Sequence, residues 1–208
     1  TRSLGRARIN VASPDGAVKS STNIIIVIGS TPTTARFAYV TNDADQTISE
    51  YTVNSTTGQL RSNGYVLAGR QPVALALDPD GKFAYVANAG DNTLSAFSSD
   101  PVTGVLAAVA GSPFPAGINP NAVAADPSGS FVYVSNSNPS NISVFSVDRL
   151  SGTLTPVAGS PFSNGATPSS IVADPWGKFI YVTNPASNSV SGFAINPSTG
   201  ALSAVPNS

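Results

Sequence analysis

A six-residue motif recurs four times along the 208-residue chain, and it constrains the fold more than any other feature. The copies read Phe-Ala-Tyr-Val-Thr-Asn at 37–42, Phe-Ala-Tyr-Val-Ala-Asn at 83–88, Phe-Val-Tyr-Val-Ser-Asn at 131–136 and Phe-Ile-Tyr-Val-Thr-Asn at 179–184. Successive copies begin 46, 48 and 48 residues apart. A constant spacing in this range is typical of repeat arrays such as the blades of a propeller.

Each repeat contains four strand candidates that are separated by turns. In the last copy they are 169–173, 179–183, 189–195 and 201–205. The first turn, Asp174-Pro175-Trp176-Gly177, combines a capping carboxylate, a proline that fixes φ and a glycine suited to positive φ. No segment has helical periodicity. The sequence therefore predicts an all-β fold, a β-propeller built from four-stranded antiparallel blades, with four blades in this chain.

The motif strand is apolar on both of its faces, because aromatic residues alternate with aliphatic ones. A sheet with one face in water would alternate apolar and polar residues instead. Blades that stack around an axis cover both faces. We therefore expect the repeated aromatic residues to lie in the core, namely Phe37, Tyr39, Phe83, Tyr85, Phe131, Tyr133, Phe179 and Tyr181.

Residues 1–22 differ from the repeats, since they carry four basic residues and a single acidic one, Asp15. We interpret this segment as an N-terminal arm or as the remnant of a preceding repeat. Residues 23–208 are expected to form the four blades, with bounds near 23–68, 72–110, 120–158 and 168–207. An open arc of blades would expose an apolar face at each end, and such faces usually mark an interface.

The composition excludes several classes of function. Charged residues make up 10% of the chain and the net charge is −1, so the clustered basic residues of a nucleic-acid-binding protein are missing. The longest aliphatic run, 24–28, is too short to span a membrane. A surface rich in Ser, Thr and Asn, with two glycosylation sequons at 54–56 and 141–143, favours an extracellular or cell-surface location.

The chain contains neither His nor Cys, so Ser-His-Asp triads, Cys-His pairs and the usual zinc sites are excluded. Asp43 and Asp45 have the alternate spacing of calcium ligands but lack the rest of a calcium loop. We therefore predict no catalytic residue, no metal site and no cofactor. Asp78, Asp126 and Asp174 occupy one repeat position and are expected to cap turns.

Four other residues are candidates for contact with a ligand or partner. Glu50 is the only Glu and stands where other repeats have Ala, Val or Gly; a general base is one interpretation, and a solvated residue of an outer strand is the favoured one. Trp176 lies in a turn, where it could stack on a sugar, anchor a partner or cover the next blade. Arg36 and Arg70 flank the first repeat and could bind an anion.

The Tyr-Val-Thr-Asn core, the Asp-Pro-x-Gly turns and the Gly-Ser-Pro-Phe segments at 111–114 and 159–162 resemble the YVTN family of β-propellers. That family is similar to lactonase-type propellers, which include 6-phosphogluconolactonase-like proteins. The resemblance implies a propeller that usually has seven blades. It also implies lactone hydrolysis as an activity, although fold alone does not determine function.

Two functions are weighed on this basis. The favoured one is a non-enzymatic secreted or surface propeller that acts as a scaffold, binding module or self-assembling subunit, because the repeats are nearly identical and lack catalytic residue types. The alternative is a lactonase-like hydrolase. The open blade faces and the arm at 1–22 predict a homo-oligomer or a part of a longer chain, without nucleic acid and without a membrane span.

Overall fold

Four antiparallel sheets follow one another along the chain in the computed structural model, which describes residues 24–28 and 35–206. Sheet 1 contains β1 (Ile24–Ile28), β2 (Ala35–Asn42), β3 (Thr47–Val53) and β4 (Leu60–Leu67). Sheet 2 contains β5 (Pro72–Leu77), β6 (Phe83–Asn88), β7 (Thr93–Ser99), β8 (Leu106–Ala108) and β9 (Phe114–Pro115).

The third and fourth sheets repeat this strand order. Sheet 3 contains β10 (Ile118–Ala125), β11 (Phe131–Asn138), β12 (Ser140–Val147), β13 (Leu154–Pro156) and β14 (Phe162–Ser163). Sheet 4 contains β15 (Ser170–Ala173), β16 (Phe179–Asn184), β17 (Ser189–Ile195) and β18 (Leu202–Ala204). The short 3₁₀ helix η1 (Pro185–Ser187) joins β16 to β17, and no helix in the described residues could cross a membrane.

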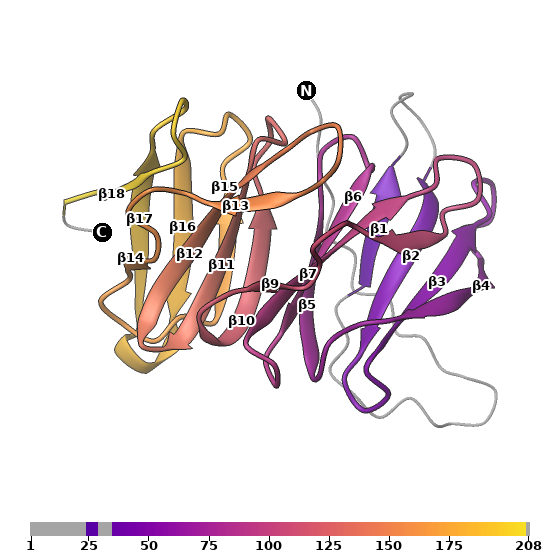
Figure 1. The fold of residues 1–208 in the computed structure, drawn as a ribbon, viewed down its shortest axis with the longest axis horizontal. Helices are drawn as coiled ribbons and strands as arrows, with labels where there is room; N and C mark the ends of the chain where they lie inside the picture. The colour runs from indigo at the N-terminus through magenta and orange to yellow at the C-terminus, as the bar shows by residue number, and fades with distance from the viewer. Residues whose placement is uncertain (1–23, 29–34, 207–208) are drawn as a thin grey trace.

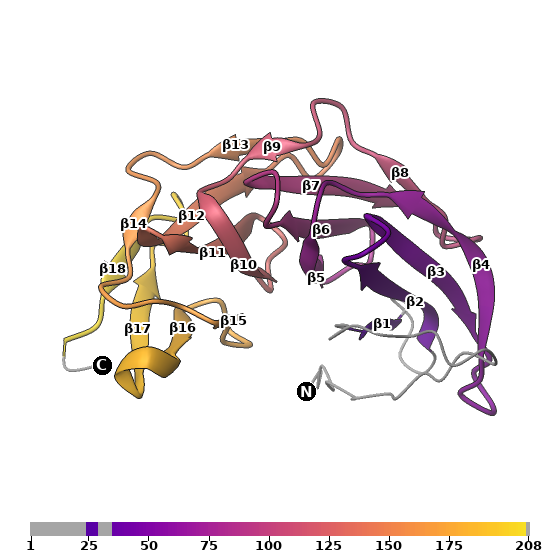
Figure 2. The same ribbon diagram turned by 90° about the horizontal axis from the view of Figure 1, so that it is seen from below.

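The sheets stand side by side along an arc (Figure 1), and their first strands lie on its concave side (Figure 2). This arrangement confirms the predicted all-β propeller fold. Sheets 2 and 3 differ from the expected four strands, because the Gly-Ser-Pro-Phe segments return to the third strand and add β9 and β14. The arm predicted at 1–22 lies outside the described residues.

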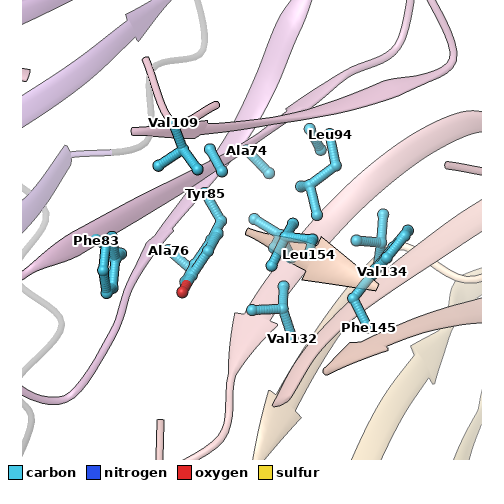
Figure 3. Packing of buried hydrophobic residues seen from close by; sticks show 13 residues of the cluster. Ala74, Ala76, Phe83, Tyr85, Leu94, Val109, Val132, Val134, Phe145 and Leu154 are labelled. Carbon is cyan, nitrogen blue, oxygen red and sulfur yellow. The ribbon is translucent and has the colours of Figure 1, made fainter. Parts of the chain in front are cut away.

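Side chains from neighbouring sheets interlock at each joint between sheets. At the joint of sheets 2 and 3, Phe83 and Tyr85 of the motif strand pack against residues of sheet 3 (Figure 3). The buried residues that sheet 3 contributes to this cluster are Val123, Val132, Val134, Phe145 and Leu154. The same residue types form the joint of sheets 1 and 2 and the joint of sheets 3 and 4. The motif therefore builds the core by stacking sheets.

A glycine in the turn between the third and fourth strands fits over the motif phenylalanine of the preceding sheet. A Cβ added to Gly152 would lie 2.4 Å from Phe83, and Gly104 and Gly200 have the same relation to Phe37 and Phe131. These glycines also have positive φ, a backbone conformation that other residues rarely adopt. Both constraints select glycine at this position of the repeat.

The motif asparagine ties the third strand of its own sheet and the link from the preceding sheet together. Asn88 donates from Nδ2 to Thr93 (3.0 Å) and Ser95 (2.9 Å), and its Oδ1 accepts the N–H of Gly69 at 3.2 Å. Asn136 makes the corresponding contacts in sheet 3, including a hydrogen bond from the N–H of Gly117. The asparagine of the motif therefore has a structural function.

Sheet 4 departs from the expectation that every motif aromatic residue is buried. Six of the eight are buried as predicted, but Phe179 is half-buried and Tyr181 is 43% exposed. No described sheet follows sheet 4, so the face that carries these two rings is uncovered (Figure 2). The prediction was wrong for Tyr181 because burial of this position requires a neighbouring sheet.

Candidate functional site

The two edges of the sheets carry different loops. The turn edge holds the turns between first and second strands and between third and fourth strands. The linker edge holds the turns between second and third strands and the links from one sheet to the next. Antiparallel pairing places these edges at opposite ends of every strand.

Five carboxylates on the turn edge accept hydrogen bonds from the backbone of their own turns. Asp78, Asp126 and Asp174 each accept backbone N–H groups of their own turn, which confirms their predicted capping role. Asp100 and Asp148 hold the turns between third and fourth strands, and hydrogen bonds from backbone N–H groups lower the pKa of both carboxyls. These five groups are therefore unsuited to act as bases toward a substrate.

Asp80 is the remaining carboxylate of the described turn edge, and it pairs with a cation. Its Oδ2 lies 2.7 Å from Nη2 of Arg149, which belongs to the next sheet. Arg149 also donates to the carbonyl oxygen of Ser128. The pair joins sheets 2 and 3 and leaves neither charge free.

Glu50 lies between sheets 1 and 2 and is only 2% exposed. Its Oε1 accepts the N–H of Leu106 in sheet 2 at 2.8 Å. Burial raises the pKa of this carboxyl. The favoured interpretation of a solvated residue was wrong, because this position of β3 faces the neighbouring sheet. The contact makes Glu50 part of the joint between sheets.

Asp43, Asp45 and Asp91 are the carboxylates of the linker edge, and all three are exposed. Asp43 and Asp45 make no hydrogen bond or ion pair with any residue that the structure describes. Asp91 accepts the backbone N–H of Arg70 at 2.6 Å, so the Arg70 side chain starts beside this carboxylate. Within the described part of the linker edge, these four residues carry all of the charge.

The backbone of the linker edge is also distinctive. Five residues other than glycine have positive φ in the described chain, and all of them lie on the linker edge: Gln46, Gln71, Asn92 and Asn188 in its loops, and Asn119 at the start of β10. The turn edge uses glycine at its positive-φ positions, as at Gly81 and Gly129. Asn and Gln side chains in such loops present amide groups at fixed positions, and backbone of this kind is enriched at functional sites.

The four residues predicted to contact a ligand or partner do not come together. Glu50 is buried at the joint of sheets 1 and 2, whereas Arg36 is exposed on the turn edge with its guanidinium 5.5 Å from the Phe37 ring. Arg70 is exposed on the linker edge. Their binding roles stay predictions, and only Arg70 lies next to available carboxylates.

Trp176 is 80% exposed and lines a shallow groove of about 630 Å³ on the open face of sheet 4. Phe179, Tyr181 and Lys178 line it as well. Its one carboxylate, Asp174, is held by three N–H groups of its own turn. The groove therefore suits packing against a partner better than it suits catalysis.

Sequence reasoning missed Asp91 as a member of the candidate site. The signal was present in the repeats, because Asp45 and Asp91 occupy the position at which sheet 4 has Ser187. A comparison of the linker-edge loops alone would have shown that sheets 1 and 2 carry acidic residues there and that sheets 3 and 4 do not.

Comparisons with known proteins place this geometry in a family. The family model described as "Lactonase, 7-bladed beta-propeller" matches residues 30–120 and 109–208. No curated protein sequence matches the chain. A protein from Bacteroides uniformis, provisionally identified as a 6-phosphogluconolactonase, has a TM-score of 0.77 and 23% identity over 93% of this chain and 56% of its own.

Two further solved structures have the same fold. A protein from Lactobacillus plantarum has a TM-score of 0.71 and 24% identity over 93% of this chain and 62% of its own. The periplasmic gluconolactonase of Pseudomonas aeruginosa has a TM-score of 0.68 and 22% identity over 94% of this chain and 52% of its own. The chain thus spans little more than half of these structures. From the family match, it belongs to the family of lactonases with a seven-bladed β-propeller.

Proposed function

We propose that the protein is a lactonase-like hydrolase whose linker edge, at sheets 1 and 2, supplies catalytic groups. The family match carries this proposal. The geometry supports it, because the exposed carboxylates of Asp43 and Asp45 make no hydrogen bond or ion pair with the described residues. Asp91 engages only its Oδ2, with the N–H of Arg70. Arg70, whose backbone N–H binds Asp91, adds a permanent positive charge to this edge.

The expectation of a non-enzymatic scaffold is corrected by the family match and by structural neighbours named as lactonases. That expectation relied on missing His and Cys and on repeats without a polar cluster. Hydrolysis of a lactone needs neither residue type, since a carboxylate can act as the general base. The linker edge of sheets 1 and 2 also carries exposed polar residues, in loops that the strand motif does not include.

The chemistry requires a base, a water molecule and stabilisation of an oxyanion. A carboxylate of the linker edge takes a proton from water while the oxygen attacks the lactone carbonyl carbon. The guanidinium of Arg70 stabilises the negative oxygen of the tetrahedral intermediate. The ring C–O bond then breaks, and the alkoxide takes the proton back from the carboxylic acid. The product is a hydroxy acid, and the carboxylate is regenerated.

The test is lactone hydrolysis by the whole protein and by matched variants, followed as acid release in a pH-stat. Asp91→Asn keeps the acceptor for the N–H of Arg70 but removes the base, so a fall in kcat of about 100-fold is expected if Asp91 fills that role. Asp43→Asn and Asp45→Asn test the other two carboxylates.

Asp100→Asn is the control, because Asn54 and Asn196 hold the equivalent turns in sheets 1 and 4. Full activity in all three linker-edge variants would contradict the assignment of the site. Absence of hydrolysis in the unaltered protein would contradict the proposed function.

The open face of sheet 4 supports a further proposal, that another propeller blade covers it in a homo-oligomer or in a longer chain. Trp176, Phe179 and Tyr181 line this face, and the same motif rings are buried at every described joint. Tyr181→Glu would place a charge in the interface. A drop in mass by light scattering would indicate a second copy, whereas an unchanged monomer would exclude it. The extracellular or surface location stays a prediction.

A further inference from the structure

We infer that the active site takes an uncharged, polyhydroxylated lactone in preference to a phosphorylated one. This inference rests on the proposed function, because it concerns the same linker-edge residues. It goes beyond the family, whose structural neighbours are named for phosphorylated and for unphosphorylated substrates alike. The two substrate classes differ by a phosphate dianion, so the charge around the site distinguishes them.

The charge of the linker edge is unfavourable for a phosphate. Asp43, Asp45 and Asp91 are exposed there, and Arg70 is the one cation that the described part of this edge contains. Arg70 starts beside the carboxylate of Asp91, whose Oδ2 accepts its backbone N–H at 2.6 Å. A dianion that approached Arg70 would meet the carboxylate of Asp91 next to it, on an edge that carries more negative than positive charges, and such contacts select against a ligand.

The other cations of the described chain lie at the opposite end of the strands. Five of the six basic residues are on or next to the turn edge: Arg36, Arg61, Lys82, Arg149 and Lys178. Arg149 is already paired with Asp80. Recognition of phosphate relies on Arg or Lys groups that converge on one point. The described sheets place their cations where they cannot converge on a ligand at the linker edge.

Neutral amide groups also lie on the candidate surface. Gln46, Gln71 and Asn92 are exposed in loops of sheets 1 and 2 on this edge, and Asn119 is exposed at the start of β10. An amide both donates and accepts hydrogen bonds, which matches the hydroxyl groups of a sugar-derived lactone. Asn92 is held in place because its Oδ1 accepts the N–H of Asn119 at 2.8 Å. Amides and carboxylates together favour a neutral polyol over an anion.

The experiment compares kcat/KM for gluconolactone and for its 6-phosphate with the whole protein. At an ionic strength of about 0.01 M, we expect the neutral lactone to be favoured by about tenfold or more. Raising the ionic strength to about 0.5 M should increase kcat/KM for the phosphorylated lactone and leave the neutral one unchanged, because salt screens the repulsion.

Charge-removing variants separate the local effect from a general one. If Asp91 is the catalytic base, Asp43 and Asp45 contribute only their charge. Asp43→Asn and Asp45→Asn are then expected to reduce the ratio of kcat/KM for the neutral lactone to kcat/KM for the phosphorylated lactone several-fold. Asp100→Asn, which removes the same charge from the turn edge, should leave the ratio unchanged. A preference for the phosphorylated lactone, or a ratio that neither salt nor these variants change, would overturn the inference while the hydrolase itself stands.

Inactivity toward both lactones would count against the proposed function and not against the charge preference. Binding would then decide, with sorbitol and sorbitol 6-phosphate as probes that cannot be hydrolysed. The inference is supported if sorbitol 6-phosphate binds more weakly than sorbitol and if the difference in affinity disappears at high salt. Tighter binding of the phosphate overturns it.

Discussion

The joint between sheets 1 and 2 and the joint between sheets 2 and 3 use the same motif but differ in their polar contacts. In the first joint, the hydroxyl of Tyr39 donates to the carbonyl oxygen of Gly104 at 2.6 Å and lies 2.9 Å from Oγ of Ser99. In the second joint, the hydroxyl of Tyr85 is buried and has no hydrogen-bond partner among the described residues. The same motif tyrosine is therefore hydrogen-bonded at the first joint and not at the second.

Single residues of the neighbouring strands explain the difference. Ser99 of sheet 2 is replaced by Val147 at the equivalent position of sheet 3, so Tyr85 meets an apolar side chain where Tyr39 meets a hydroxyl. Glu50 is replaced by Ala96, and with it the hydrogen bond to the next sheet is lost. The apolar packing is the same at each joint because the motif residues repeat. The polar contacts differ because the residues that make them differ between repeats.

The largest expected effect concerns what the joints share, the glycine that fits over phenylalanine. Gly152→Ala would place a Cβ 2.4 Å from Phe83 in a residue with φ of 77°, so both overlap and backbone strain destabilise it. We expect a loss of about 3–4 kcal/mol in the free energy of unfolding, measured by urea denaturation. Gly104→Ala should cost a similar amount.

Gly58→Ala is the matched control for this prediction. Gly58 occupies the same turn of sheet 1 with φ of 73°, but nothing lies within 4 Å of an added Cβ. Only the backbone strain of an alanine at positive φ applies here, so we expect the free energy of unfolding to fall by about 1 kcal/mol. Equal losses at Gly58 and Gly152 would mean that contact with Phe83 contributes nothing.

The shared features are the ones that could be predicted from the sequence. Repeated aromatic residues, Asp-Pro turns and positive-φ glycines recur at one spacing, so the four strands of the last repeat and the Asp-Pro turns were predicted closely, although β9 and β14 were not. Burial of Glu50 and exposure of Tyr181 could not be predicted in this way. Both depend on which sheet lies opposite, and a strand pattern does not contain that information.

The second prediction tests the unequal tyrosines. Tyr39→Phe removes two hydrogen-bonding contacts and leaves the Gly104 carbonyl without its partner, so a loss of about 1–2 kcal/mol in stability is expected. Tyr85→Phe removes a buried hydroxyl that has no partner, so its stability should be unchanged or higher. Thermal and urea unfolding of the two variants check this, and equal losses would contradict the difference between the joints.

The candidate site was less predictable than the joints for a related reason. Arg70 was identified from its position beside the first repeat, and Asp43 and Asp45 were considered as calcium ligands. Their placement on one edge together with Asp91 follows from antiparallel pairing, which is visible once the strands are known. The chemical use of these residues depends on loops that differ between repeats, and a search for recurring motifs passes over such loops.

The third prediction uses the buried carboxyl of the first joint. Because burial raises the pKa of Glu50, the folded protein holds this proton more tightly than the unfolded chain. The resulting stability is complete below the ordinary pKa and is lost as pH rises through the folded pKa. Glu50→Gln stays neutral and keeps an acceptor for Leu106. The stability of Glu50→Gln relative to the unaltered protein should therefore increase as the pH rises above the ordinary pKa of a Glu carboxyl.

The measurement is urea denaturation of both proteins at each pH, with Asp100→Asn as a comparison of opposite sign. Asp100 has a lowered pKa, so its carboxylate favours the fold above the ordinary pKa and that contribution is lost as pH falls. If the difference in the free energy of unfolding between Glu50→Gln and the unaltered protein does not vary with pH, burial does not raise the pKa of this carboxyl.

The smallest expected effect concerns the ion pair between Asp80 and Arg149 at the second joint, which has no counterpart among the described residues of the first joint. Asp80 and Arg149 are 2.7 Å apart, but their side chains are 37% and 48% exposed, so water and salt screen the attraction. Asp80→Ser introduces the residue that sheet 3 has at this position, Ser128, and should cost about 0.2–1 kcal/mol. A double-mutant cycle with Arg149→Ser isolates the pair. A coupling energy that persists at about 1 M salt would mean that the joint shields these charges more than their exposure indicates.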